Sequence, residues 1–173
     1  MQTSLQKIGR AMRWAAACCA LALAAACQTP PPAPAAQTGL SQQQVQVLRD
    51  QGFQESDAGW TLEMAGRILF ETDSDVVAAP LREQVRRTGK ALHGVGIDRL
   101  RVEGHTDQSG TRKYNEELSL RRARAVADLL VAAGILPGNV EVQGFGFDRP
   151  LVQNGSHADH QENRRVAIVV PAH

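Results

Sequence analysis

The sequence predicts a two-layer α/β sandwich of the α+β kind, in which helices cover one face of a single β-sheet. Strand-like and helix-like patterns alternate from about residue 67 to residue 170, and this alternation is typical of such a sandwich. The 173 residues are 43% apolar and 21% charged, which fits one globular domain of ordinary composition. No second domain is needed to account for the chain.

The folded part begins with a short amphipathic helix in LSQQQVQVLRDQGF, residues 40–53. Ser41 is suited to cap its N-terminus, Val45 and Leu48 supply a thin apolar stripe, and Gly52 ends it. Beyond this helix the chain shows little helical period for about a dozen residues. The large apolar side chains there must be covered by the domain or by a partner.

A strand is expected at RILFE, residues 67–71, followed by a helix from about Pro80 to Leu92. Apolar residues recur every three to four positions along this helix, and Gly94 and Gly96 end it. Its predicted buried face consists of Leu81, Val85, Thr88 and Leu92.

The clearest strand is DRLRVEGHTD, residues 98–107, where apolar or small residues alternate with charged ones, as in a half-buried strand. The most regular helix follows at 114–133, because its apolar residues recur at i, i+3, i+4 and i+7, and Gly134 is its natural C-cap. A third strand is expected at 139–146. A polar loop with a short helix then leads to the last strand, RRVAIVV, residues 164–170.

Residues 1–26 have the pattern of a bacterial secretory signal. Three basic residues and no acidic one precede the apolar run WAAACCALALAAA, which is too short to span a bilayer. The sequence LALAAAC at 21–27 is similar to a lipobox, although Ala24 stands where the usual pattern has Leu. We therefore expect cleavage before Cys27 and lipidation of its thiol. An uncleaved anchor helix and a plain secreted protein are the alternatives.

Processing at Cys27 would lower the formal charge of the chain from +1 to −2, so a nucleic-acid partner is not indicated. Cys27 would remain as the only cysteine and carry lipid, which leaves no disulfide. Gln28 after the cysteine is typical of sorting to the outer membrane. Residues 27–39 then form a lipidated, Pro/Ala-rich tether that reaches roughly 35–40 Å if extended.

A lone acid and a helical arginine form the candidate binding site. Asp107 begins the turn DQSG, and Asn115 and Arg122 share one stripe of the following helix at i and i+7. Gly110 permits a backbone conformation closed to other residues and lets a ligand approach the main chain. An anion and a cation held about 10 Å apart would suit a zwitterion through charge-assisted hydrogen bonds. The alternative is an ordinary surface ion-pair network.

The motifs GHTDQSGTRKYNEELSLRRARAV, GFGFDRP and ENRRV, in this order, resemble the OmpA-like peptidoglycan-binding domain over about residues 68–170. The resemblance implies a mixed sheet and non-covalent capture of the diaminopimelate residue of the cell-wall stem peptide. By position, Asp107 would receive the ammonium group of the ligand and Arg122 its carboxylate, with Arg165 as a second cation. Asp73 stands where family members often have Asn. The implied pocket lining is Thr106, Gly110, Asn115 and Leu118.

Outside that domain, residues 27–53, the pair GW at 59–60 and the ending NRRVAIVVP resemble the lipoproteins of the YfiB–YfiN–YfiR signalling system. In that family an outer-membrane lipoprotein sequesters the periplasmic repressor YfiR, which frees the diguanylate cyclase YfiN to make cyclic-di-GMP and so controls biofilm formation. The resemblance implies a lipid-anchored protein of the outer membrane that faces the periplasm. A purely structural tether between outer membrane and peptidoglycan is the alternative, and a homodimer is left open.

The expected organisation is therefore a signal peptide at 1–26, a lipidated tether at 27–39, an amphipathic segment at 40–66 and the OmpA-like domain at 67–171. Large apolar anchors dominate protein interfaces, so residues 40–66 are a candidate repressor-binding segment. The alternative is that their apolar side chains simply pack this segment on the domain. The candidate partner-binding residues are Leu48, Phe53, Trp60 and Leu62.

An enzyme is not expected. His105 and Asp107 form an H-x-D pair, and His157 and His160 lie three residues apart, but the loop that carries the second pair has no rigid frame for a metal. There is no nucleophile motif such as G-x-S-x-G and no phosphate-binding glycine loop before a helix. No cofactor is therefore predicted.

Overall fold

The structure is a computed structural model that describes residues 39–65, 70, 74–153 and 157–171, all within one compact unit, Gln37–His173. Its strands are β1 (Gln54–Ser56), β2 (Gly59–Ala65), β3 (Leu100–His105), β4 (Val140–Gly144) and β5 (Arg165–Pro171). Its helices are α2 (Gln42–Asp50), α4 (Ala79–Gly94), α5 (Arg112–Ala132) and α6 (His157–Asn163), with a short 3₁₀ turn at Pro137–Asn139.

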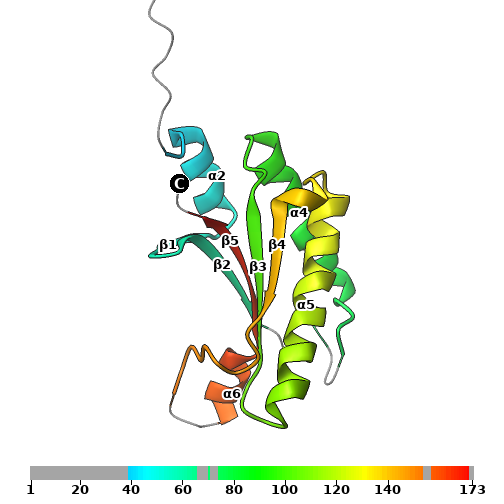
Figure 1. Ribbon diagram of the computed structural model, residues 1–173. Coiled ribbons are helices and arrows are strands. Elements are labelled where there is room, and N and C mark those ends of the chain that lie inside the picture. Colours follow the sequence, from blue (N-terminus) through cyan, green and yellow to red (C-terminus); the bar gives the residue numbers. More distant parts are fainter. Residues whose placement is uncertain (1–38, 66–69, 71–73, 154–156, 172–173) are drawn as a thin grey trace, which may run out of the picture. The chain divides into compact units, whose positions relative to one another are not determined.

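The five strands form one mixed sheet in the order β1-β2-β5-β3-β4 (Figure 1). Strand β5 lies at the centre and runs antiparallel to both β2 and β3, whereas β3 and β4 are parallel. The parallel pair is connected through α5, as such a crossover requires. The expected mixed sheet and the α+β fold class are confirmed.

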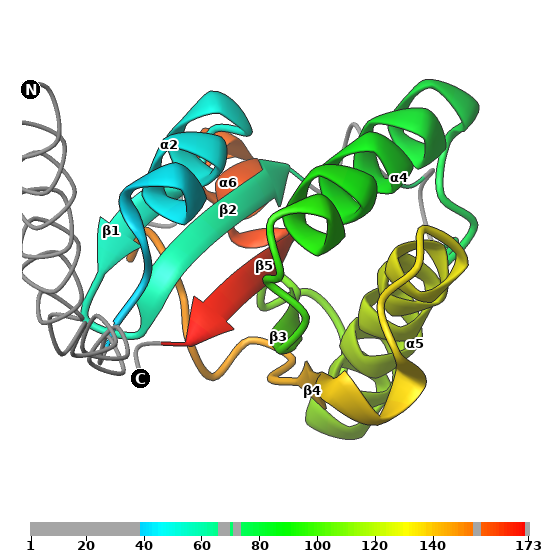
Figure 2. The ribbon, with the colours of Figure 1, turned by 90° about the horizontal axis from the view of Figure 1, so that it is seen from above.

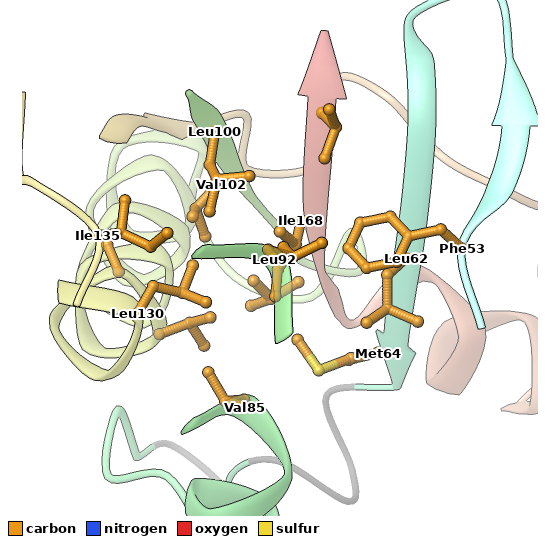
Figure 3. Packing of buried hydrophobic residues seen from close by; sticks show 14 of the residues in the cluster. Phe53, Leu62, Met64, Val85, Leu92, Leu100, Val102, Leu130, Ile135 and Ile168 are labelled. Atoms are coloured by element: carbon orange, nitrogen blue, oxygen red, sulfur yellow. The ribbon is translucent and has the colours of Figure 1, made fainter. Parts of the chain in front are cut away.

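The hydrophobic core lies between one face of the sheet and α2, α4 and α5, which pack over that face (Figure 2). Alternate residues of three neighbouring strands point into it, because side chains in a strand alternate between the two faces. Figure 3 shows Leu62 and Met64 of β2 and Ile168 of β5 meeting Leu92 of α4 and Leu130 of α5. One core therefore joins all the layers.

The helix ends follow local sequence signals. Ser41 caps α2 through a complete capping box, because its hydroxyl accepts from the Gln44 amide and the Gln44 side chain accepts from the Ser41 amide. Pro80 lies in the first turn of α4, where its missing N–H leaves no bond unmade. Gly134 follows α5 with φ of 117°, as expected for a C-cap glycine.

The β1–β2 hairpin differs from the sequence-based expectation, which had no strand before residue 67. Of the residues expected as a strand at 67–71, the structure describes Phe70 alone, as an isolated bridge to Val77. The strand that pairs with β5 is β2, whose residues Trp60, Leu62 and Met64 alternate toward the core. This period of two was the missed signal.

The hairpin also changes the expected role of residues 40–66. Strand β2 pairs with β5 along its whole length, so both sides of the boundary expected at residue 67 share one sheet and one core. Leu48, Phe53, Trp60 and Leu62 are only 0%, 3%, 9% and 8% exposed. The structure therefore favours the alternative that these four side chains pack residues 40–66 on the domain, because the protein's own core covers them.

Two glycines let α5 lie unusually close to the sheet. Gly104 of β3 and Gly144 of β4 are register partners, and both face the middle of α5. A Cβ atom on Gly104 would lie 2.0 Å from the Ser119 carbonyl oxygen, and one on Gly144 would lie 2.6 Å from the Leu120 nitrogen. This close approach fixes the helix against the strand ends, where the candidate site residues gather.

Candidate functional site

The candidate site lies where three segments meet at one end of the sheet. Strand β3 ends at His105, helix α5 begins at Arg112, and α6 passes into β5 around Arg164. In Figure 1 the start of α5 and helix α6 lie together at this end, whereas α2 and the end of β5 lie at the other. The site is thus built from chain segments about 60 residues apart in sequence.

Asp107 is held in place at the end of β3. Its side chain is 8% exposed, Oδ1 accepts from the Ser109 amide at 2.9 Å, and Oδ2 accepts from the Arg164 guanidinium. Burial, the largest single influence, opposes ionisation of Asp107, but the Ser109 and Arg164 hydrogen bonds outweigh it, so the pKa of this carboxyl is lowered. Asp107 is a fixed anion at neutral pH.

The turn from Asp107 to α5 is closed by side-chain hydrogen bonds. Asn115, which is 2% exposed, donates through Nδ2 to the Ser109 carbonyl at 2.7 Å. Gly110 has φ of 92°, a backbone conformation that favours glycine, and the Thr111 hydroxyl caps α5 by accepting from the Tyr114 amide. These bonds fold the turn back onto the first turns of α5.

Arg122 is a buried cation two turns further along α5. It is 6% exposed, its Nε donates to the Ser74 carbonyl at 2.9 Å, and its guanidinium carbon lies 5.0 Å from the centroid of the Phe70 ring. Asn115 and Arg122 are seven residues apart, which is about 10 Å along a helix. Asn115 is joined to the Asp107 turn, so the anion and the cation are both anchored to one rigid helix.

Thr106, between β3 and Asp107, has an unusual environment. It is 3% exposed, its amide donates to the Gly146 carbonyl at 2.7 Å, and its hydroxyl finds no hydrogen-bond partner among the described residues. The adjacent Ser119 hydroxyl accepts from the Gly146 amide at 2.9 Å and donates to the Glu116 carbonyl. Leu118 is 6% exposed on the same helix face. A buried hydroxyl without a partner is costly and rare in folded proteins.

The structure places Arg165 outside this cluster, contrary to the expectation of a second cation there. Its Nε donates to Glu63 at 3.0 Å, and its other nitrogens contact the carbonyls of Arg149 and Asn163. The arginine that contacts Asp107 is Arg164. The alternation of side chains along β5 could have revealed the position of Arg165. Val166, Ile168 and Val170 point into the core, so Arg165 lies on the opposite face of the strand.

Asn163 fixes the junction that carries Arg164. Its Oδ1 accepts from the amides of Leu151 and Val152 at 2.7 and 3.1 Å, and its Nδ2 donates to the Val152 carbonyl at 2.9 Å. These three bonds hold the loop before α6 against the end of that helix. Sequence reasoning did not assign this role to the Asn of the ENRRV motif.

His105 belongs to a different cluster, on the face of the sheet away from the helices. Its ring stacks on Phe145 at 5.5 Å, and its Nε2 lies 3.7 Å from Oε2 of Glu103. The other oxygen of Glu103, Oε1, accepts from Arg101 Nε at 2.6 Å. The contacts with His105 and Arg101 lower the pKa of Glu103 to about 2, against the opposing effect of burial. Within the described ranges no group of three or more His, Cys, Asp or Glu side chains could hold a metal ion.

Several expected features lie outside the described residues. These are Asp73, Cys27, the signal peptide and the tether up to residue 38. Among the helices that the structure does describe, none combines the length and the apolar character needed to cross a bilayer.

Comparison with known proteins gives consistent matches. A family model described as OmpA family matches residues 69–164. The outer-membrane lipoprotein YfiB of Pseudomonas aeruginosa is 44% identical over 136 residues, which cover 79% of this chain and 81% of that protein. The peptidoglycan-associated lipoprotein of Agrobacterium fabrum is 30% identical over 115 residues, which cover 66% of this chain and 65% of that protein.

A solved structure extends the likeness to three dimensions. The cell wall anchor of the T6SS from Pseudomonas aeruginosa superposes with a TM-score of 0.61 and 30% sequence identity. The match covers 76% of this chain and 95% of that one. The fold and the site residues described above are thus found in a chain whose relatives are named for the outer membrane, for peptidoglycan and for the cell wall.

Proposed function

The chain belongs to the OmpA family as a lipoprotein of the YfiB type, and from that premise we propose that it is an outer-membrane lipoprotein that binds peptidoglycan without covalent attachment. The ligand is the diaminopimelate residue of the stem peptide. The observation that carries the proposal is the fixed pair of opposite charges formed by Asp107 and Arg122, both 6% exposed and both anchored to α5.

The chemistry of diaminopimelate suits this pair. Its free end is a zwitterion with one ammonium and one carboxylate, and each can form a charge-assisted hydrogen bond with an opposite charge on the protein. Asp107 receives the ammonium group and Arg122 receives the carboxylate. Because both side chains are oriented before the ligand arrives, little conformational entropy is lost on binding.

The surrounding residues complete the proposed site. Gly110 brings exposed main chain next to Asp107, and the buried hydroxyl of Thr106, which has no hydrogen-bond partner among the described residues, is proposed to bond to a polar ligand atom. Asn115 fixes the turn, and Leu118 supplies apolar surface beside it. Asp73 is proposed as a further contact, with a carboxylate that either assists the ammonium or repels the carboxylate of the ligand.

The test is calorimetric titration of the chain from Gln37 onward with a tripeptide muropeptide that ends in diaminopimelate. We expect Asp107→Asn and Arg122→Gln each to lose at least tenfold in affinity, since unpaired buried charge is costly. Arg121→Gln is the matched control, because Arg121 is the neighbouring arginine, is 45% exposed and pairs with Asp75 instead. Equal binding by all four proteins would reject the proposed site.

The anchoring arrangement is part of the proposal. Cys27 carries the lipid, residues 28–39 form the tether, and the domain faces the periplasm from the outer membrane. The relative from Pseudomonas aeruginosa is named as an outer-membrane lipoprotein, which supports this arrangement. A Cys27→Ala protein that still fractionated with the outer membrane would contradict it, and lipidation itself is checked by mass spectrometry of the mature N-terminus.

A regulatory role is the finer part of the proposal. As a YfiB-type lipoprotein, the protein sequesters a YfiR-like periplasmic repressor and thereby releases the diguanylate cyclase YfiN. The support is the 44% identity to YfiB, which extends beyond the part matched by the family model. A purely structural tether remains the competing function, and a specific repressor complex is what separates the two.

The proposed repressor surface is the exposed outer layer of α2 and β1, rather than the buried residues beneath it. The Arg49 guanidinium lies 5.6 Å from the Trp60 ring, and Arg49 and Glu55 line a shallow groove of about 450 Å³ over Trp60. We expect Arg49→Glu to weaken repressor binding as measured by biolayer interferometry. The control Arg86→Glu, at an exposed position of α4, should leave repressor binding unchanged. Sedimentation of the same samples tests the homodimer.

A further inference from the structure

We propose that Arg164 is a built-in competitor that occupies the ammonium position on Asp107 in the unliganded protein and sets the affinity of the site. The inference rests on the proposed function of Asp107 and Arg122. It assigns Arg164 a role opposite to that of a ligand contact: the side chain must leave Asp107 for the ligand ammonium to take its place.

The contact itself is direct. Arg164 Nη1 donates to Asp107 Oδ2, on the oxygen that the Ser109 amide does not use. A guanidinium and an ammonium group are both cationic hydrogen-bond donors, so both can bind the Asp107 carboxylate. The unliganded protein therefore already contains a surrogate for the ammonium group at the atom where the ligand is proposed to bind.

Arg164 is also the arginine of the motif that is able to move. Its side chain is 30% exposed, whereas that of Arg165 is 9% exposed and donates to Glu63 and to two main-chain carbonyls. The backbone at this position is fixed by Asn163 and by the bond from the Arg164 amide to the His160 carbonyl. The guanidinium can thus swing into solvent without disturbing the fold.

Electrostatics makes the exchange necessary. A ligand ammonium at hydrogen-bond distance from Asp107 would lie close to the Arg164 guanidinium, and two like charges at that distance repel. Displacing a partly exposed ion pair costs little, because such pairs contribute weakly to stability. The contact with Arg164 therefore keeps Asp107 ionised and correctly oriented when the site is empty, and lowers the affinity for the ligand by a modest factor.

The experiment compares wild type, Arg164→Gln and Arg164→Lys in the same muropeptide titration, with Asp107→Asn and Arg121→Gln alongside. Loss of the competitor should tighten binding about two- to fivefold in Arg164→Gln. Arg164→Lys keeps a cation and should stay close to wild type. In wild type, saturation with muropeptide should also move the NMR signals of the Arg164 side chain toward their positions in Asp107→Asn.

The outcomes distinguish a failure of the competitor role of Arg164 from a failure of the proposed peptidoglycan binding. If wild type binds and Arg164→Gln binds equally or more weakly, the competitor role is wrong and Arg164 is neutral or a ligand contact, while the proposed function stands. If folded wild type does not bind the muropeptide at all, the proposed function fails, and this inference fails with it. Thermal unfolding of each variant establishes that it is folded.

Discussion

Glu103 and Asp107 show how the same side-chain chemistry serves two purposes within five residues. Both are buried carboxylates with a lowered pKa. Glu103 lies within strand β3 on the face away from the helices, where Arg101 compensates its charge and the His105 ring contacts it. Asp107 lies beyond the strand end, where a turn and an exchangeable arginine compensate it. Glu103 therefore stabilises the sheet, whereas Asp107 is the carboxylate that is proposed to bind the ligand.

The Glu103 network makes stability depend on pH. The folded-state pKa of about 2 is below the ordinary value of 4.5, so ionised Glu103 stabilises the fold above about pH 4.5 and this contribution is lost as the pH falls toward 2. The shift corresponds to at most roughly 3 kcal/mol. Urea unfolding should show Glu103→Gln clearly less stable than wild type at pH 7 and nearly equal to it at pH 2.

A suitable control is Glu117→Gln on the exposed side of α5, which should leave the pH dependence of wild type intact. If the stability gap between wild type and Glu103→Gln were the same at both pH values, the network would not be the source of the stabilisation.

Thr106 offers a test in which stability and binding move separately. Its buried hydroxyl has no partner among the described residues, so Thr106→Val removes a polar atom and keeps the shape. We expect the free energy of unfolding to stay the same or rise slightly, because an unsatisfied buried group is lost. Affinity for the muropeptide should fall about three- to tenfold. If Thr106→Val lost stability but bound the muropeptide normally, the hydroxyl would contribute to folding stability and not to ligand binding.

At the scale of elements, the close contact between α5 and the β3–β4 pair positions the site. The in-register glycines 104 and 144 allow it, and no other residue would fit without displacing helix backbone. The same helix carries Asn115 and Arg122. A shift of α5 would therefore displace both Asn115 and Arg122.

Gly104→Ala should destabilise the protein by at least 1–3 kcal/mol, the usual cost of overpacking a core, and should weaken muropeptide binding as well. Gly138→Ala is the matched control, since nothing lies within 4 Å of a Cβ at that position. Thermal unfolding and titration measure the two effects. Unchanged binding in a folded Gly104→Ala protein would show that the helix position does not control the site.

Elements with strong patterns were predictable from the sequence. The capping residue Ser41 and the buried face of α4 depend on neighbouring residues only, and both are confirmed. In β3, Leu100 and Val102 lie in the core as expected, but Glu103 and His105 on the other face are buried as well, so the prediction of a half-buried strand is wrong. The β1–β2 hairpin was missed because its period of two is short and no resemblance pointed to it. The choice between Arg164 and Arg165 depends on which face of β5 each side chain takes, which a motif alone does not state.

At the scale of the whole domain, the candidate site and Gly39, the first described residue, lie at opposite ends. Strand β5 runs from Arg165, next to the site, to Pro171, which lines a groove together with Gly39. Seven residues of strand span about 23 Å. Figure 1 shows α2 and the end of β5 at the end of the domain away from α6. In the proposed arrangement, the tether joins the domain at Gly39, at the end opposite the candidate site.

This geometry predicts an effect of tether length that is absent from the isolated domain. Deleting about half of residues 28–39 would shorten a reach of roughly 35–40 Å by a similar fraction. We expect the lipidated, membrane-bound protein to be crosslinked less to cell-wall sacculi in cells, while the purified domain binds muropeptide as before. Equal crosslinking in cells would contradict the proposed role of residues 28–39 as a tether.

The central claim is that Asp107 and Arg122 together recognise a zwitterion, and the most direct measurement compares two muropeptides that differ only in ending with diaminopimelate or with lysine. Lysine lacks the carboxylate and cannot form the charge-assisted hydrogen bond that is proposed with Arg122. We predict at least tenfold weaker binding of the lysine muropeptide to wild type, loss of this discrimination in Arg122→Gln, and weak binding of both ligands by Asp107→Asn. Equal affinity of wild type for the two muropeptides would contradict the account.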